Sequence, residues 1–275
     1  MNLLVKQNSF GNTLGLKYYE IISRNPSSLS IFTAENRSLL LSKSECNFLY
    51  KKTFLSENYP FGLINKVVKT GVVETNENRI HHFNRTVEKS LAVIKNIPAF
   101  HDLLKNCIRC VIPLGEASQI SQMRKDGSGF SAHWLKGAIF LSLPQEHPFP
   151  ELELAINLVH ELGHQVLMFF QDADALIEKD FAKPIYSAIR KTSRPAIMSL
   201  HALVAIHFMN YFINELLRFD SSLNDQQKSY LLNKKRQLSC DFATGCFALK
   251  GVDFTPIGAE IMLEMIEYFR EARVA

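Results

Sequence analysis

Five consecutive residues near the middle of the chain, His160, Glu161, Leu162, Gly163 and His164, carry its clearest chemical pattern. They read HExxH, and residues four apart on a helix lie one turn above each other on the same side. The spacing therefore directs two imidazoles at one point, as two ligands of a metal ion require. Glu161 lies beside them, where its carboxylate is available as a base or as the holder of a bound water.

The segment around the motif has the pattern of a helix over residues 150–172. Its apolar residues repeat at helical spacing and form one stripe, made of Leu152, Ala155, Ile156, Val159, Gly163, Val166, Leu167 and Phe170. His160 and His164 lie at the border of this stripe, where a side chain facing a cleft is expected. Glycine costs about 1 kcal/mol inside a helix, so Gly163 indicates that another element approaches closely. The alternative is an amphipathic helix with two polar border histidines.

A metal site needs a third ligand, and the chain offers several candidates. His147 precedes the motif in a proline-flanked loop. His201 and His207 lie six residues apart on one predicted helix, so they point about 120° from each other and only one can join the site. Glu215 is of the kind used by zinc peptidases whose third ligand is a downstream helical Glu. Residue spacing alone leaves these candidates open.

The motif's flanking residues exclude one class of zinc peptidase. The metzincin pattern requires Gly three residues after the second His and another His three residues later. This chain has Leu167 and Phe170 at those positions. The class that uses a downstream Glu is not excluded by the motif.

The predicted elements place this site in a mainly α (α+β) fold, a helical catalytic domain with a small β element packed near the HExxH helix. Residues 1–104 form a mostly helical region, a candidate peptide-binding part, with helices expected over 14–22 and 87–104. Residues 105–275 form the metal-binding catalytic region. It starts with two strands, CIRCVIPL and GAIFLSLP, joined by a polar loop over 115–136.

Three helices are predicted after the HExxH helix. The first opens with Thr192 or Ser193 as its cap, has Pro195 in its first turn, and runs to about Phe219. The second runs over about 225–250 and ends at a glycine. The last begins after Thr255-Pro256 and reaches the C-terminus.

Composition describes an ordinary soluble globule. The 275 residues are 47% hydrophobic and 21% charged, and the net charge of +4 is spread along the chain, which gives no support for nucleic-acid binding. The five cysteines, at positions 46, 107, 110, 240 and 246, have no disulfide-framework spacing. The opening MNLLVKQNSF lacks the apolar core of an export signal. We therefore expect a cytoplasmic protein, with a structural role for the Cys107–Cys110 pair.

One segment has the length and composition of a membrane span. Residues 195–214 contain no Asp, Glu, Lys or Arg. They do contain Ser199, His201, His207 and Asn210, whose polar groups are expensive in lipid. A helix buried in a large soluble core has the same composition, so we expect no membrane partner.

Three stretches, GAIFLSLP, ELELAINLVHELGHQVL and PIYSAIRKTSRPAIMSLHALVAIHF, resemble the HExxH-type peptide β-hydroxylases. These are iron- and 2-oxoglutarate-dependent enzymes that modify ribosomally made bacterial peptides. The family pattern runs from a strand ending near Ser-Leu through HExxH, a Pro-Trp-Arg element and Arg-Pro to Leu-His-Gly. The order and approximate spacing are kept here over about residues 106–215.

The resemblance assigns roles position by position. His160, His164 and His201 take the three metal-ligand positions, which leaves His207 a packing role. Arg190 takes the Arg of Pro-Trp-Arg and Arg194 that of Arg-Pro. One of them would grip the distal carboxylate of 2-oxoglutarate, since a guanidinium binds a carboxylate through two parallel hydrogen bonds.

The chain departs from the family pattern at two points. Ala188-Ile189 stand where Pro-Trp is expected, which removes an aromatic wall from the substrate pocket, and Ala202 replaces Gly. Neither change touches a ligand position. The resemblance implies a cytoplasmic dioxygenase that uses Fe(II) and 2-oxoglutarate to hydroxylate a side-chain β-carbon of a ribosomal precursor peptide. Glu161 would then orient a ligand or a water.

Two other functions are alternatives to the dioxygenase interpretation. In a zinc metallopeptidase the same histidines hold Zn(II), which lowers the pKa of its bound water, and Glu161 accepts the proton as general base. The paired Arg190 and Arg194, which a peptidase does not need, favour the oxygenase. The third candidate is a catalytically inactive protein that only binds peptides. The sequence sets no oligomeric state.

Overall fold

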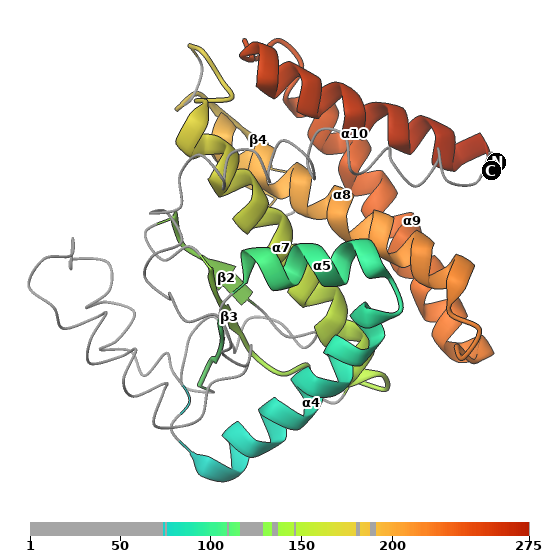
Figure 1. The fold of residues 1–275 in the computed structure, drawn as a ribbon. Helices are drawn as coiled ribbons and strands as arrows, with labels where there is room; N and C mark the ends of the chain where they lie inside the picture. The colour runs from blue at the N-terminus through green and yellow to red at the C-terminus, as the bar shows by residue number, and fades with distance from the viewer. Residues whose placement is uncertain are drawn as a thin grey trace, which may run out of the picture. The chain divides into compact units, whose positions relative to one another are not determined.

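The structure is a computed structural model that describes residues 74, 76–108, 110–115, 129–133, 137–145, 147–179, 182–187 and 191–274 (Figure 1). Its described part is mainly α with small β elements, as predicted. The helices are α4 (Glu77–Lys95), α5 (Pro98–Cys107), α7 (Pro150–Ala173), α8 (Ala196–Phe219), α9 (Asp225–Ala248) and α10 (Pro256–Val274). The strands are β1 (Cys110–Pro113), β2 (Gly129–Ser131), β3 (Ala138–Leu141), β4 (Pro184–Ser187) and β5 (Thr192–Pro195).

The described residues fall into two compact units that divide inside helix α7. The sheet unit contains the described residues up to Glu161, and the helical unit contains those from Leu162 onward. The predicted division into 1–104 and 105–275 stays a prediction. The helix predicted over 14–22 lies outside the described residues.

The described part of the sheet unit has two helices where the sequence predicted one over 87–104, and that prediction was wrong. Helix α4 ends at Lys95 and α5 begins at Pro98. Proline has no backbone N–H and disfavours helical geometry in the residue before it. Ile97 is accordingly extended, with φ −121° and ψ 91°. Proline is well suited to the first position of the helix that follows.

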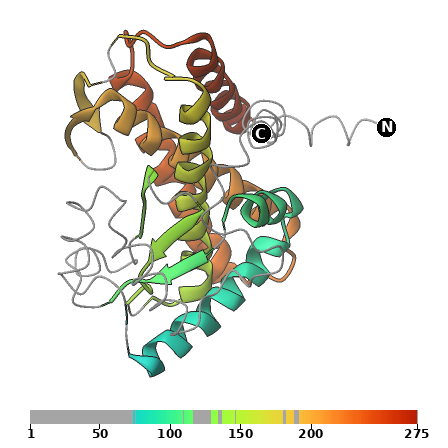
Figure 2. The ribbon, with the colours of Figure 1, turned by 60° about the vertical axis from the view of Figure 1, so that its left-hand side comes forward.

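The sheet of this unit has strand order β1-β3-β2, with β1 parallel and β2 antiparallel to β3 (Figure 2). Strand β3 is buried along its whole length, and Phe130 of β2 stacks on Phe140 of β3 with ring centroids 4.3 Å apart. Both predicted strands exist, although the first starts only at Cys110, because Cys107 still belongs to α5. The predicted loop over 115–136 was wrong at β2, which the pairing with β3 makes a strand.

Helix α7 carries the HExxH motif over the predicted range. Its apolar stripe is buried as expected. The two motif histidines are half-buried, which matches their predicted place at the border of the stripe.

The helical unit joins the end of α7 to α8, α9 and α10 (Figure 1). The predicted cap of α8 was wrong, because Thr192 and Ser193 pair with β4 in the hairpin β4–β5. Pro195 therefore stands at the N-cap, outside the first turn. Asn224 closes a capping box at the start of α9, and Gly251, with φ +84°, follows its end.

Helix α8 is long and apolar enough to cross a membrane by length and composition. In the structure 89% of its most apolar window is buried inside the protein.

Candidate metal centre

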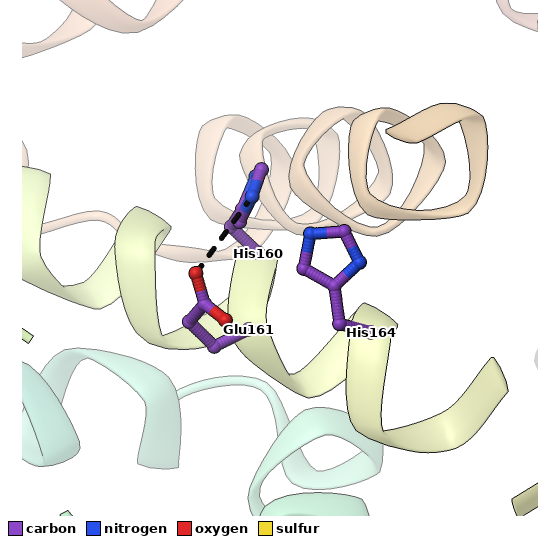
Figure 3. Close-up of side chains that lie close together, drawn as sticks. All are labelled: His160, Glu161 and His164. Atoms are coloured by element: carbon purple, nitrogen blue, oxygen red, sulfur yellow. Dashed lines mark ion pairs between the residues drawn. The ribbon is translucent and has the colours of Figure 1, made fainter. Parts of the chain in front are cut away.

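His160, Glu161 and His164 project from consecutive turns of α7 (Figure 3). One ligand atom from each lies within 4.8 Å of those of the other two. Helical geometry produces this cluster, because residues at i and i+4 share one side of the helix. Among the described residues, α7 thus presents two imidazoles and a carboxylate at spacings suited to a metal ion.

The carboxylate of Glu161 is held between its own helix and strand β2. Glu161 is only 1% exposed, and the Ser131 hydroxyl donates to its Oε2 over 2.7 Å. Its Oε1 lies 3.8 Å from His160 Nε2 (Figure 3). A Cβ at Gly129 would lie 2.8 Å from the same Oε1 and 2.9 Å from the Phe140 backbone oxygen, so a larger residue here would crowd the carboxylate. The strand therefore fixes the direction in which Glu161 points.

His201, in the second turn of α8, lies beside His164. The two ring centroids are 5.5 Å apart and the rings are tilted by 40°. His201 is 6% exposed, and its Nε2 is 2.7 Å from Oε1 of Gln171, in the last turn of α7. The structure thus brings the third predicted ligand next to the second.

The sequence predicted that another element approaches Gly163 closely, and in the structure that element is α8. A Cβ on this residue would lie 3.1 Å from the Ala205 Cα and 3.2 Å from the Phe208 Cγ. The prediction of a close contact at Gly163 is therefore confirmed. This contact, together with the Gln171–His201 bond nearer the start of α8, shows that the two helices run antiparallel.

His207 occupies a different environment from His201. Its ring is 1% exposed and meets Tyr268 edge-on, with centroids 5.0 Å apart, and it also contacts Phe269. Burial lowers the pKa of His207 to about 3. His207 thus packs against α10, and packing is the role that was expected for it.

Glu215 and His147 were the other ligand candidates. Glu215 follows His201 by 14 residues on the same helix, which is about 21 Å along the axis. It therefore cannot share a metal ion with His164, the neighbour of His201. The Nδ1 of His147 accepts the Phe149 backbone N–H over 3.1 Å, a local turn bond just before α7.

The structure describes only one of the two arginines proposed to bind 2-oxoglutarate. Arg194 lies on β5, opposite Ile185 of β4, and is half-buried. It precedes His201 by seven residues, across the start of α8. Arg190 lies outside the described residues, as do Ala188 and Ile189.

The donor set fits a divalent transition metal. Imidazole nitrogen suits Fe(II) and Zn(II), and the three described side chains whose ligand atoms lie together, His160, Glu161 and His164, leave positions open for other groups. Burial of Glu161 supplies partly dry surroundings of the kind that tune such a centre. The sequence did not predict a role for Ser131 or Gln171, which form hydrogen bonds with Glu161 and His201. Each partner lies 30 residues away, and neither residue belongs to a motif.

No protein-family model matches the chain, and a search of the curated proteins finds no match either.

Proposed function

We propose that the protein is an Fe(II)- and 2-oxoglutarate-dependent oxygenase that hydroxylates a side-chain β-carbon of a ribosomally made peptide, with His160, His164 and His201 as the metal ligands. The observation that supports this proposal is the place of the His201 ring beside that of His164, with centroids 5.5 Å apart. The helix distance that separates Glu215 from this point counts against a peptidase with Glu215 as its third ligand.

The reaction would couple oxidation of 2-oxoglutarate to insertion of one oxygen atom into a C–H bond. Peptide, 2-oxoglutarate and O₂ become hydroxylated peptide, succinate and CO₂, so each O₂ contributes one atom to each organic product. The iron supplies the O₂ activation, and three protein ligands leave room for a bidentate 2-oxoglutarate.

The surroundings of Glu161 support an orienting role. Its Oε2 accepts a hydrogen bond from Ser131 and its Oε1 faces the His160 ring. A carboxylate that accepts the second N–H of a metal-binding imidazole orients the ring and raises its basicity. Glu161 would form such a bond if its 3.8 Å separation from His160 shortened to hydrogen-bond distance. A peptidase would instead need this carboxylate to take a proton from water.

The place of Glu161 also supports a peptide substrate. Strand β2, which holds Glu161, is an outer strand in the described sheet. Extended peptides add to such edges through main-chain hydrogen bonds. An oxygenase acting on a peptide would have its substrate backbone held next to the motif.

The direct test is anaerobic reconstitution of the full chain with Fe(II), followed by titration with 2-oxoglutarate. Chelation of iron by 2-oxoglutarate produces a weak charge-transfer band in the visible range, which should rise and saturate. His164→Ala should abolish the band. Absence of the band in the wild-type protein, with tight Zn(II) binding and cleavage of a peptide library, would establish the peptidase. Absence of any metal binding would favour the third candidate function, a catalytically inactive protein that binds peptides.

Glu161→Gln separates the two enzymes by turnover. General-base catalysis contributes about 10²- to 10⁴-fold, so a peptidase should lose nearly all activity. The oxygenase should keep its charge-transfer band and part of its peptide-dependent succinate formation.

Arg194 is the described candidate for the distal carboxylate of 2-oxoglutarate. Hydrogen bonds to charged groups contribute about 1.5–3 kcal/mol, so Arg194→Ala should weaken 2-oxoglutarate binding roughly 10- to 100-fold. Lys191→Ala is the matched control, because this cation of the same hairpin pairs with Asp241 of α9 at 3.2 Å. An unchanged titration in Arg194→Ala would move the cosubstrate contact to another residue.

A further inference from the structure

The hydrogen bond between Gln171 and His201 bears on which nitrogen of His201 carries the proton. The two atoms joined are His201 Nε2 and Gln171 Oε1, at 2.7 Å. A carbonyl oxygen only accepts, so Nε2 must donate its hydrogen. A neutral imidazole has one N–H, and the lone pair that a metal needs is then on Nδ1.

We propose that Gln171 is a positioning residue of the candidate metal centre: it holds His201 in the Nε2–H tautomer and makes Nδ1 the atom through which His201 binds the metal. This inference rests on the proposed function. Metal-binding imidazoles use one nitrogen as ligand while the other donates to an oxygen, which fixes the ring and strengthens the ligand. Gln171 supplies that oxygen from the helix that also carries His160 and His164.

The packing around the pair keeps this arrangement in place. His201 is 6% exposed, and its ring is flanked by His164 at 5.5 Å. The close contact at Gly163 fixes the separation of α7 and α8 near the same point. Gln171 lies two turns beyond His164 on α7, on the side that meets the first turns of α8. The amide and the imidazole are thus carried by two helices whose spacing is set independently of the bond.

A purely structural hydrogen bond would also be lost on substitution, so stability alone does not test the proposal. The tautomer of His201 does, because it reports on the ring itself. It can be measured in the metal-free full chain labelled with ¹⁵N-histidine, by long-range ¹H–¹⁵N correlation above the ordinary His pKa. The signals of His201, among nine histidines, are those missing from His201→Ala.

The wild-type protein should show His201 as the Nε2–H tautomer. Gln171→Leu removes the acceptor at similar size and should shift His201 toward the Nδ1–H form. Gln171→Glu retains an acceptor and should restore the wild-type tautomer. Gln226→Leu is the matched control, since this exposed residue of α9 undergoes the same chemical change away from the site.

The same variants are then titrated with Zn(II), which needs no cosubstrate. Loss of such an outer hydrogen-bond partner costs about 10- to 100-fold in metal affinity, so Gln171→Leu should weaken binding by that factor. Gln171→Glu should recover the affinity, and Gln226→Leu should leave it unchanged.

Two results would overturn the proposal: a wild-type His201 in the Nδ1–H tautomer, or a Gln171→Leu protein with unchanged tautomer and Zn(II) affinity. A wild-type protein that binds neither Zn(II) nor Fe(II) would instead refute the proposed function. In that case the tautomer measurement still decides whether Gln171 holds the His201 ring.

Discussion

Helix α8 buries two histidines six residues apart in opposite surroundings. His201 meets a glutamine amide and the imidazole of His164, whereas His207 meets the rings of Tyr268 and Phe269. Residues six apart on a helix point about 120° from each other, so the two rings face different neighbours. Burial alone therefore does not identify a candidate ligand on an apolar helix. The position of the residue around the helix axis does.

The largest expected difference between the two histidines is in metal binding. An outer partner already contributes about 10- to 100-fold, so loss of a ligand should cost more. We expect His201→Ala to weaken Fe(II) or Zn(II) binding by more than about 100-fold. His207→Phe, which keeps a ring among the aromatic residues of α10, should bind as tightly as the wild-type protein. Metal titration of the two purified variants measures both effects.

Equal losses in the two variants would remove the distinction between them. The same conclusion would follow from full metal binding by His201→Ala. Circular dichroism of both metal-free variants provides the control that each is folded.

The elements that local pattern specifies were predicted well. Helix α7 follows its apolar stripe, and α10 starts at Pro256, within one residue of the start predicted after Thr255-Pro256. Both signals lie within the element itself. The existence of α8 was also predicted, because its apolar run is long, but its start was not.

The elements that depend on distant partners were missed. Strand β2 has only three residues and owes its conformation to pairing with β3. The hairpin β4–β5 takes up the residues predicted to cap α8. At the site, the motif itself predicted the helix-borne His160 and His164, whereas Gln171 and Ser131 follow only from the packing of separate elements. A single sequence carries no local signal for such pairs.

The second difference between the histidines is in the pH dependence of stability. Burial lowers the pKa of His207 to about 3 in the folded protein. In the unfolded chain it titrates near its ordinary value of about 6.5. Between these values the unfolded state binds one more proton, so the His207 contribution to stability is fully present above about pH 6.5 and is lost as pH falls toward about 3. At about pH 5 the loss should be about 2 kcal/mol.

His207→Phe should remove this contribution, which urea unfolding at pH 7 and pH 5 can measure. The neighbouring Glu215 acts in the opposite direction, because burial raises its pKa and favours its neutral form. Tyr211 and Tyr268 titrate far above this window, since burial raises the pKa of both. All three remain in the variant, so the difference between the two proteins isolates His207. Identical pH dependence in both would show that His207 is hydrated in solution.

The smallest effect concerns the helix contact that places His201 beside His164. Alanine gains about 1 kcal/mol over glycine inside a helix. At Gly163, however, the added Cβ would lie 3.1 Å from the Ala205 Cα, a backbone atom that moves only with α8. Overpacking of this kind costs about 1–3 kcal/mol, so Gly163→Ala should lower the free energy of unfolding by about 1 kcal/mol and weaken metal binding.

Gly245→Ala, on α9, is the matched substitution for this last test. Its Cβ would lie 2.7 Å from Cδ1 of Leu203, the end of a flexible side chain that can rotate away. The gain in helix propensity then remains, and Gly245→Ala should leave stability unchanged or raise it slightly. Urea unfolding compares the two alanines directly. If Gly163→Ala is as stable as Gly245→Ala and retains its metal affinity, the contact at Gly163 does not set the spacing of His164 and His201. That spacing would then depend on the Gln171–His201 bond and the remaining packing of α7 against α8.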